Sequence, residues 1–122
     1  MTDPKAPGEV ALRYRDDTLA WETLVDTDRL VLGTCEILPG SAYKIHKHVV
    51  PETYVITRGT GEVYDDTRWR SVAKGDVVVF KPGAWHCCRT FDPAGIDLVY
   101  FFDTGTFATI DYIYPETAAS KL

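Results

Sequence analysis

The 122-residue chain has few cysteines, few histidines and no long apolar run, and each shortage excludes a class of protein. Three cysteines, two of them adjacent at Cys87 and Cys88, do not form the even-numbered framework of a disulfide-rich secreted domain. No apolar run approaches the ~18 residues that a transmembrane helix needs. The first residues lack the charged and apolar regions of a signal peptide, so we expect a cytoplasmic protein without a membrane partner.

Basic residues are outnumbered by acidic ones, 13 against 18, and the formal net charge is −5. Nucleic-acid-binding domains usually present a basic surface, so we expect no nucleic-acid partner. The sequence also lacks a glycine-rich phosphate loop and a nucleophile elbow. At 45% hydrophobic and 25% charged, its composition is that of one globular domain. We assign residues 9–116 to that domain, residues 1–8 to a flexible arm and residues 117–122 to a frayed tail.

Helical periodicity is absent, because no stretch keeps apolar residues at helical spacing for three turns. Short runs rich in β-branched and aromatic residues alternate instead with turns that contain glycine, proline or aspartate. Examples of these runs are residues 29–38, 53–57, 76–81, 95–103 and 108–114. Short strands at this spacing predict an all-β sandwich or barrel.

Two of the three histidines form the pair His46-x-His48, and Glu52 follows four residues later. In a strand, residues two apart project from the same face, so the two imidazoles lie together. Pro51 favours a turn at which the chain returns, and Glu52 can then face the same space. Two imidazoles and a carboxylate suit a divalent transition metal. The alternative is a solvent-exposed strand whose polar residues bind nothing.

The third histidine, His86, ends a segment from residue 75 that predicts a strand, a Pro-Gly turn and a further strand. If that further strand returns beside the first, His86 supplies a fourth ligand. Three histidines and one carboxylate leave one or two positions of an octahedral metal open for substrate or water. The metal could be Fe, Mn, Ni, Zn or Co, because this donor set accepts all of them.

These two segments together resemble the cupin superfamily. The first cupin motif, G(X)5HXH(X)3–4E(X)6G, is met by Gly40, His46, His48, Glu52 and Gly59. The second, G(X)5PXG(X)2H(X)3N, is met at Gly75, Gly83 and His86, but the proline is displaced by one to Pro82 and Thr90 replaces the asparagine. The resemblance implies a single-domain cupin jelly-roll barrel, or double-stranded β-helix, in which the three histidines and Glu52 hold the metal.

Cupins commonly pair as dimers through edge strands and swapped arms. The resemblance therefore implies a homodimer. The segment from Glu9 to Tyr14 and the exposed sheet edges are the expected contacts, because an unpaired strand edge invites a partner.

A narrower resemblance is to the small cupin lyases that cleave dimethylsulfoniopropionate into dimethyl sulfide and acrylate, and it extends from about Trp21 to Tyr112. Those enzymes place one tyrosine two residues after the metal-binding glutamate and a second on a late strand. Tyr54 and Tyr112 occupy these positions here. The resemblance implies that Tyr54 is the base that removes the proton next to the substrate carboxylate, with Tyr112 as a helper. The alternative for both is an aromatic residue that fills the barrel interior.

One departure from the lyase pattern is Lys44, which precedes His46 by two residues and is expected to share its inward face. There it would clamp a substrate carboxylate or phosphate, or act as a base if burial lowers its pKa. The alternative is a side chain that reaches into solvent at the barrel mouth. Among the tryptophans, Trp21 is expected in the pocket wall.

Three functions remain open for a site of this kind. The first is a metal-dependent lyase or isomerase that abstracts an α-proton from a small-molecule substrate. The second is an Fe(II) dioxygenase that uses the same four ligands. The third is a biosynthetic cyclase or a non-catalytic binding module, in which the barrel shapes or holds a ligand. The metal motif does not encode the substrate, because one barrel supports many chemistries.

Overall fold

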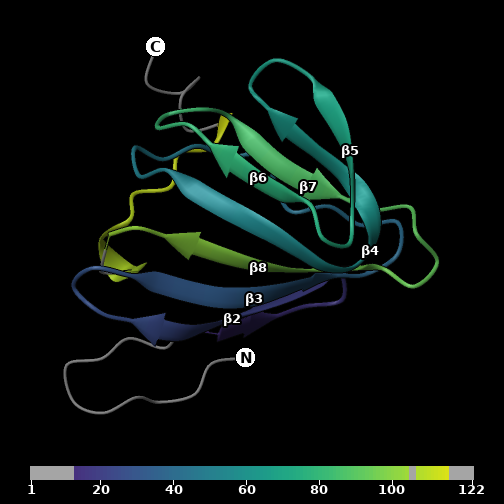
Figure 1. The fold of residues 1–122 in the computed structure, drawn as a ribbon, viewed down its shortest axis with the longest axis horizontal. Coiled ribbons are helices and arrows are strands. Elements are labelled where there is room, and N and C mark those ends of the chain that lie inside the picture. Colours follow the sequence, from purple (N-terminus) through teal and green to yellow (C-terminus); the bar gives the residue numbers. More distant parts are fainter. Residues whose placement is uncertain (1–12, 105–106, 116–122) are drawn as a thin grey trace.

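The computed structural model describes residues 13–104 and 107–115, which form a nearly all-β molecule of eight antiparallel strands (Figure 1). The elements are β1 (Arg13–Arg15), β2 (Leu19–Asp26), β3 (Val31–Ile37), β4 (Glu52–Asp65), β5 (Trp69–Ala73), β6 (Val77–Phe80), β7 (His86–Arg89), β8 (Ile96–Phe102) and the 3-10 turn η1 (Phe107–Thr109). Within the described ranges, no helix is long and apolar enough to cross a membrane. The predicted arm at 1–8 and tail at 117–122 lie outside the described residues.

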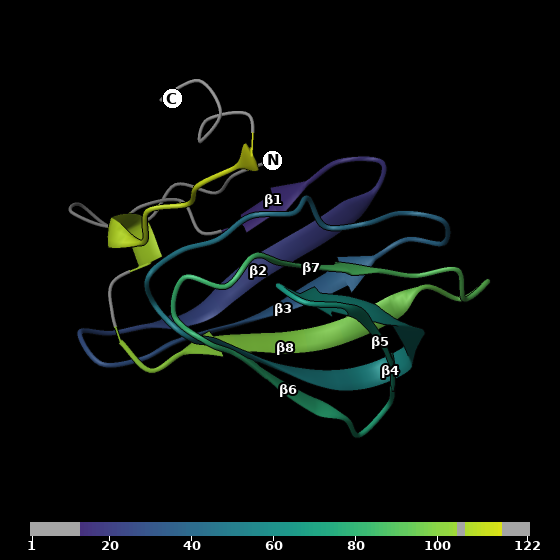
Figure 2. The same ribbon diagram turned by 90° about the horizontal axis from the view of Figure 1, so that it is seen from above.

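The strands form a curled sheet because the long strand β4 takes part in both of its layers (Figures 1 and 2). The first half of β4 lies between β8 and β6, and the second half lies between β5 and β7. Partners change beside a register shift between Ile56 and Arg58 and at Gly59, whose φ of 82° suits glycine. A side chain at Gly59 would collide with the carbonyl oxygen of Gly95. The arrangement confirms the predicted double-stranded β-helix.

Most of the predicted strands are present, but two predictions need correction. The runs at 29–38, 76–81 and 95–103 are confirmed as β3, β6 and β8. The run at 53–57 is only the first half of β4, since the glycines at 59 and 61 allow the strand to bend and continue where their sequence predicts a turn.

The strand predicted at 108–114 is wrong. This segment holds part of η1 and a single bridge between Lys47 and Ile113. Phe107, just before this segment, and Ile110 and Tyr112 within it point inward. They are spaced three and then two residues apart, as a 3-10 turn followed by extended chain requires. The spacing of a regular strand is two throughout.

The core lies between the two layers, because burial alternates along the strands. In β8 every second residue from Ile96 to Phe102 is buried, and in β6 Val78 and Phe80 are buried while Val77 and Val79 are exposed. The residues between the buried ones therefore face outward. This alternation also directs the first and third residues of β4 into the barrel interior.

Gly33 marks the closest approach of backbone and side chain in the core. A Cβ at this position would overlap the Tyr100 hydroxyl and the carbonyl oxygen of Glu22, next to the 2.7 Å hydrogen bond between the hydroxyls of Thr23 and Tyr100. We expect Gly33→Ala to lower the free energy of unfolding by about 1–3 kcal/mol through overpacking. Urea denaturation of this variant checks the value. Gly40→Ala is the control, since it meets no atom within 4 Å and costs only the strain of its positive φ, about 1 kcal/mol.

Candidate metal centre

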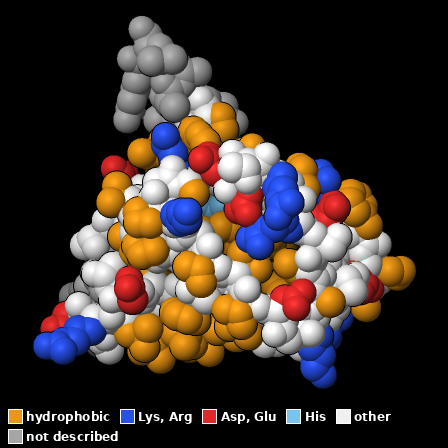
Figure 3. Space-filling model, turned by 45° about the horizontal axis from the view of Figure 1, so that its top comes forward, with side chains coloured by type: hydrophobic (Ala, Val, Ile, Leu, Met, Phe, Trp, Pro, Cys, Tyr) orange, Lys and Arg blue, Asp and Glu red, His pale blue; other side chains and the backbone are white. Residues whose placement is uncertain are grey.

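The three histidines and Glu52 meet inside the barrel from three segments of the chain. His46 and His48 precede β4, Glu52 is the first residue of β4, and His86 is the first residue of β7. His46 and His86 form an isolated antiparallel bridge, with backbone N···O distances of 3.1 and 2.8 Å. One potential ligand atom from each of the four residues lies within 4.8 Å of the others, and all four residues are buried. Because the histidines are buried, only a small pale-blue area of histidine is visible on the face shown in Figure 3.

Backbone carbonyl groups hold the three imidazole rings in the same way. Each Nδ1 contacts a carbonyl oxygen two residues away: 2.7 Å from His46 to Lys44, 2.6 Å from His48 to Val50, and 2.9 Å from His86 to Ala84. A carbonyl oxygen only accepts, so Nδ1 carries the proton and donates it, and Nε2 keeps its lone pair. Hydrogen bonds of this kind orient metal-ligating histidines. The backbone therefore turns three lone pairs toward one centre.

The carboxylate of Glu52 completes this set of acceptors. Its Oε1 lies 3.2 Å from Nε2 of His48 and 2.9 Å from Nε2 of His86. A carboxylate oxygen and a ring nitrogen without a proton both accept, so the arrangement requires a proton or a cation between them. Burial opposes ionisation of Glu52, but its close contacts with His48 and His86 outweigh burial and lower its pKa. One negative charge and three lone pairs in a buried site fit a divalent transition-metal ion.

His46 is held in its neutral form. Burial, followed by the neighbouring His86, lowers its pKa to about 4. Near pH 7 its Nε2 lone pair is therefore free for a ligand, as metal coordination by imidazole requires.

The predicted base, Tyr54, lies two residues after Glu52 on the same inward face of β4 and is buried. Its side chain lines the small cavity that also contains Glu52 and His46. Burial, and then the charge of Glu52, raise the pKa of Tyr54 well above its ordinary value. No described residue forms a hydrogen bond with its hydroxyl, whereas the nearby Tyr100 hydroxyl is bonded to Thr23. Tyr54 is therefore a neutral, uncommitted phenol in this environment.

Tyr112 also lies beside the histidines, although it is not on a strand. Its ring stacks on His46 at 5.0 Å between centroids and meets His48 edge-on at the same distance. It is held there because Lys47 and Ile113 exchange two backbone hydrogen bonds of 2.9 and 2.8 Å. The inward position predicted for Tyr112 is confirmed, and its placement on a strand is not.

Lys44 does not share the inward face of His46, and this prediction is wrong. Lys44 is exposed, and its Nζ lies 4.9 Å from the ring centroid of Tyr114. The cause is one extra residue, a bulge, in this segment. Ala42 pairs with Arg89 and His46 pairs with His86, so the chain advances four residues from Ala42 to His46 but only three along β7. An extra residue reverses which side chains point inward.

The same irregularity turns Tyr43 into the cavity, where sequence analysis did not place it. Tyr43 donates its backbone N–H to the carbonyl of Cys88 at 2.7 Å, and its ring centroid lies 5.0 Å from that of His46. Tyr43 is thus a third phenol beside Glu52 and His46. No periodic pattern in the sequence reveals it, because the bulge depends on pairing with β7.

Two sequence features next to the ligands have structural roles. Thr90, at the place of the motif asparagine, is fully buried; its hydroxyl donates to the carbonyl of Thr60 at 2.7 Å and accepts from the N–H of Asp92 at 3.0 Å. Cys88 lines the cavity, and burial raises the pKa of its thiol to about 12. That thiol is therefore protonated near pH 7.

An aromatic wall separates the metal centre from a groove at the barrel mouth. The wall consists of Trp21, Tyr43, Phe107 and Tyr112, which line both spaces. Trp21 and Phe107 stack at 5.2 Å between centroids, which confirms the predicted place of Trp21 in the pocket wall. The inner cavity has a volume of only about 20 Å³, room for about one water molecule, whereas the outer groove has about 520 Å³. Lys44 lies on the groove side of the wall.

The fold and this donor set define a class: double-stranded β-helix barrels whose interior holds three histidines and one glutamate that could bind a divalent metal ion. The family model described as a cupin domain matches residues 33–94, about half of the chain. The chain belongs to the cupin family.

Two of the similar proteins are lyases. Dimethylsulfoniopropionate lyase DddW of Ruegeria pomeroyi is 29% identical over 103 residues, which cover 80% of this chain and 67% of the relative. Among solved structures, the dimethylsulfoniopropionate lyase DddQ of Ruegeria pomeroyi matches with a TM-score of 0.72 and 23% identity, over 83% of this chain and 53% of DddQ. A mutant of Bacillus subtilis oxalate decarboxylase matches with a TM-score of 0.77 and 17% identity, over 90% of this chain and 31% of that one.

The two solved structures show a shared fold, and this chain spans only part of either protein. The similarity to DddW, in contrast, is a similarity of amino-acid sequence. Together with the four buried ligand residues, these findings support a metal-dependent cupin enzyme.

Proposed function

We propose that this chain is a metal-dependent lyase that removes the α-proton of a small carboxylate substrate, with dimethylsulfoniopropionate as the first candidate. One observation carries the proposal: phenols without a described hydrogen-bond partner line the same cavity as the ligand residues Glu52 and His46. The likeness to DddW supports the choice of substrate.

In this proposal the protein binds the metal through Nε2 of His46, His48 and His86 and through the carboxylate of Glu52. When bound, a divalent ion supplies positive charge that polarises a substrate carboxylate and lowers the pKa of a neighbouring phenol. Fe, Mn, Ni, Zn and Co remain the candidates, because the donor set accepts all of them.

Tyr54 acts as the base. Its phenolate oxygen takes the α-proton of the substrate, and the electron pair of the broken C–H bond forms the new double bond between the α- and β-carbons. The bond from the β-carbon to sulfur breaks, and its electron pair leaves with dimethyl sulfide, so acrylate is the second product. Tyr54 then returns the proton to solvent, and the atoms and charges balance. Tyr112, stacked on His46, helps by positioning the substrate against the metal centre.

The lining of the cavity suits a substrate that carries a methylated cation as well as a carboxylate. Rings of Trp21, Phe107, Tyr43 and Tyr112 surround the approach to the metal centre. Aromatic faces attract weakly hydrated cations such as quaternary ammonium groups. Because the inner cavity holds about one water, this aromatic wall has to shift when a substrate enters from the groove.

The decisive assay follows dimethyl sulfide release from dimethylsulfoniopropionate. We expect turnover after the protein is stripped with a chelator and reloaded with at least one of Fe(II), Mn(II), Ni(II), Zn(II) or Co(II), and no turnover in the stripped form. The elimination consumes no oxygen, so the rate should be equal in air and under nitrogen. A product that forms only in air would establish a dioxygenase instead, and inactivity with every metal would exclude this lyase reaction.

A further inference from the structure

Phe80, the last residue of β6, contacts both the candidate metal site and the proposed base. Its side chain is 1% exposed. Its ring stacks on the imidazole of His86 at 4.5 Å between centroids, with 20° between the planes. The ring of Tyr54 meets Phe80 edge-on at 4.8 Å, whereas the ring centroids of Tyr54 and His86 are 6.5 Å apart. Phe80 is therefore the common neighbour of one candidate ligand and the proposed base.

Among the contacts that phenyl and phenol rings of the described chain make with the three histidines, that of Phe80 is the closest and the most nearly parallel. Tyr112 stacks on His46 at 5.0 Å and 28°, and Phe102 meets His48 edge-on at 5.3 Å. Aromatic rings attract one another in offset-stacked and in edge-to-face arrangements at these distances. Phe80 makes one contact of each kind, so attractive contacts hold both of its neighbours.

A hydrogen bond and a stacked ring fix different parts of the orientation of His86. Its Nδ1 donates to the carbonyl of Ala84 at 2.9 Å, which fixes one atom of the imidazole. The angles of a hydrogen bond have a broad distribution, so this bond alone tolerates a tilt of the ring plane. The stacked ring of Phe80 opposes that tilt, because a tilted imidazole would lose close contacts on one side and overlap on the other. Together the two contacts set the direction of Nε2, which lies 2.9 Å from Oε1 of Glu52.

The backbone places Phe80 beside the candidate ligands from two directions. Phe80 pairs with Glu52 across β6 and β4. Residues 81–85 then return the chain to His86, with a turn at Gly83, whose φ of 75° suits glycine. Phe80 and His86 are therefore the two ends of one short loop, and the first of these ends is anchored to the strand that carries Glu52.

We propose that Phe80 is a positioning residue that holds the rings of His86 and Tyr54 in one arrangement beside Glu52. Its side chain has no polar atom, so it neither binds a metal nor exchanges a proton and acts only through its neighbours. It also keeps water from the face of His86 that it covers, and His86 is only 1% exposed. The part of the proposal that concerns His86 depends on the metal site alone, and the part that concerns Tyr54 rests on the proposed function.

Phe80→Leu and Phe80→Met in the full chain, with Co(II) as the probe, test the proposal. Both substitutions keep an apolar side chain in the core, but neither side chain is planar. We expect each variant to bind Co(II) at least about 10-fold more weakly than the wild type, as for other residues that orient metal ligands. Competition with a chromophoric chelator measures this affinity. The visible absorption spectrum of bound Co(II), which depends on the arrangement of its ligands, should also change.

Phe80→Met separates positioning from space filling, because the flexible methionine side chain fills core space but does not fix the plane of a neighbouring ring. We expect its Tm to stay closer to that of the wild type than the Tm of Phe80→Leu, while its Co(II) affinity is still reduced. Phe80→Met also keeps the test valid if Phe80→Leu does not fold. Wild-type affinity and an unchanged spectrum in Phe80→Met would overturn the proposal.

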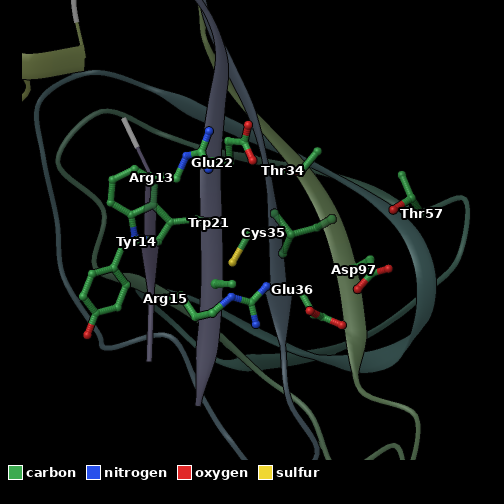
Figure 4. Close-up of a pocket in the computed structure, with 12 residues that line it drawn as sticks. Arg13, Tyr14, Arg15, Trp21, Glu22, Thr34, Cys35, Glu36, Thr57 and Asp97 are labelled. Carbon is green, nitrogen blue, oxygen red and sulfur yellow. The ribbon is translucent and has the colours of Figure 1, made fainter. Parts of the chain in front are cut away.

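Leu98→Ala is the control for a general loss of packing, since it removes as many carbon atoms from the core as Phe80→Leu. Leu98 is 2% exposed and lies in a different wall of the barrel, between the inner cavity and a groove of about 400 Å³ over β1, β2, β3 and β8 (Figure 4). The substitution should lower the Tm and leave the affinity and spectrum of Co(II) unchanged. An equal loss of affinity in Leu98→Ala and Phe80→Leu would overturn the proposal.

The lyase assay adds a readout for Tyr54. With saturating Co(II), kcat of Phe80→Met should fall by up to about 100-fold, because a small displacement of a reacting group has an effect of that size. Since Co(II) affinity is measured without substrate, a wild type that binds Co(II) but releases no dimethyl sulfide would contradict the proposed reaction and not the role of Phe80 at His86. A wild type that does not bind Co(II) would overturn that role as well.

Discussion

Tyr54→Phe should reduce turnover by a factor on the order of 10²–10⁴ while the protein retains its full metal content. The substitution removes one hydroxyl from a residue whose ring is already buried and packed on Phe80 at 4.8 Å between centroids. The fold and the four ligands are therefore unchanged, and only the proton acceptor is lost. Steady-state rates, measured together with elemental analysis of the same sample, check both halves of this expectation.

Three phenols are candidates for the base, so the loss of turnover in Tyr54→Phe has to be compared with the loss in the other two variants. Tyr43→Phe and Tyr112→Phe remove the other two uncommitted hydroxyls beside His46, and we expect each to reduce turnover by less than tenfold. Tyr100→Phe is a further control, because that hydroxyl is bonded to Thr23 at 2.7 Å. Full activity in Tyr54→Phe, or a larger loss in Tyr43→Phe, would remove Tyr54 from its proposed role.

Glu52→Gln should weaken metal binding at least about 100-fold. The two side chains are nearly the same size, but the substitution removes the only negative charge of the donor set. Even residues that only hydrogen-bond to metal ligands contribute about 10–100-fold to metal affinity, so loss of a ligand charge should cost at least as much. Competition with a chromophoric chelator measures this loss directly. Thermal denaturation gives a second readout, because a metal that binds the folded state raises the Tm of the wild type and should not raise that of the variant.

A carboxylate elsewhere on the same strand provides the control for Glu52. Glu62 of β4 faces away from the centre and accepts a hydrogen bond from Arg89 Nε at 2.9 Å. Glu62→Gln removes one negative charge from β4 without touching the ligands, so metal affinity should be unchanged. Equal losses in the two variants would show that net charge, and not coordination by Glu52, determines metal binding.

Most of the candidate metal centre was predictable from sequence because three of its four residues are close together in the chain. His46, His48 and Glu52 fall within seven residues, and the spacing of strand and turn alone brings them to one side. His86 follows a second turn of recognisable composition. Local spacing therefore carried most of the information about this part of the site.

Pairing between distant strands decided the features that sequence analysis missed. The inward turn of Tyr43 and the exposure of Lys44 both come from one extra residue opposite β7, and parity counted along the sequence cannot detect it. The 14-residue length of β4 was missed because glycines such as Gly59 and Gly61 are typical of turns. Here they lie where β4 passes from one layer to the other, so the strand bends at this point and continues.

The sequence by itself determined the all-β class, the cupin family resemblance and the four candidate ligand residues, since each rests on short-range spacing and residue chemistry. The tertiary structure decided how the imidazole rings are oriented, which phenols reach the cavity and where the aromatic wall stands. These features depend on register between strands that are far apart in the chain. Register is set by the packing of the whole barrel, because a shift of one residue would exchange its inner and outer faces.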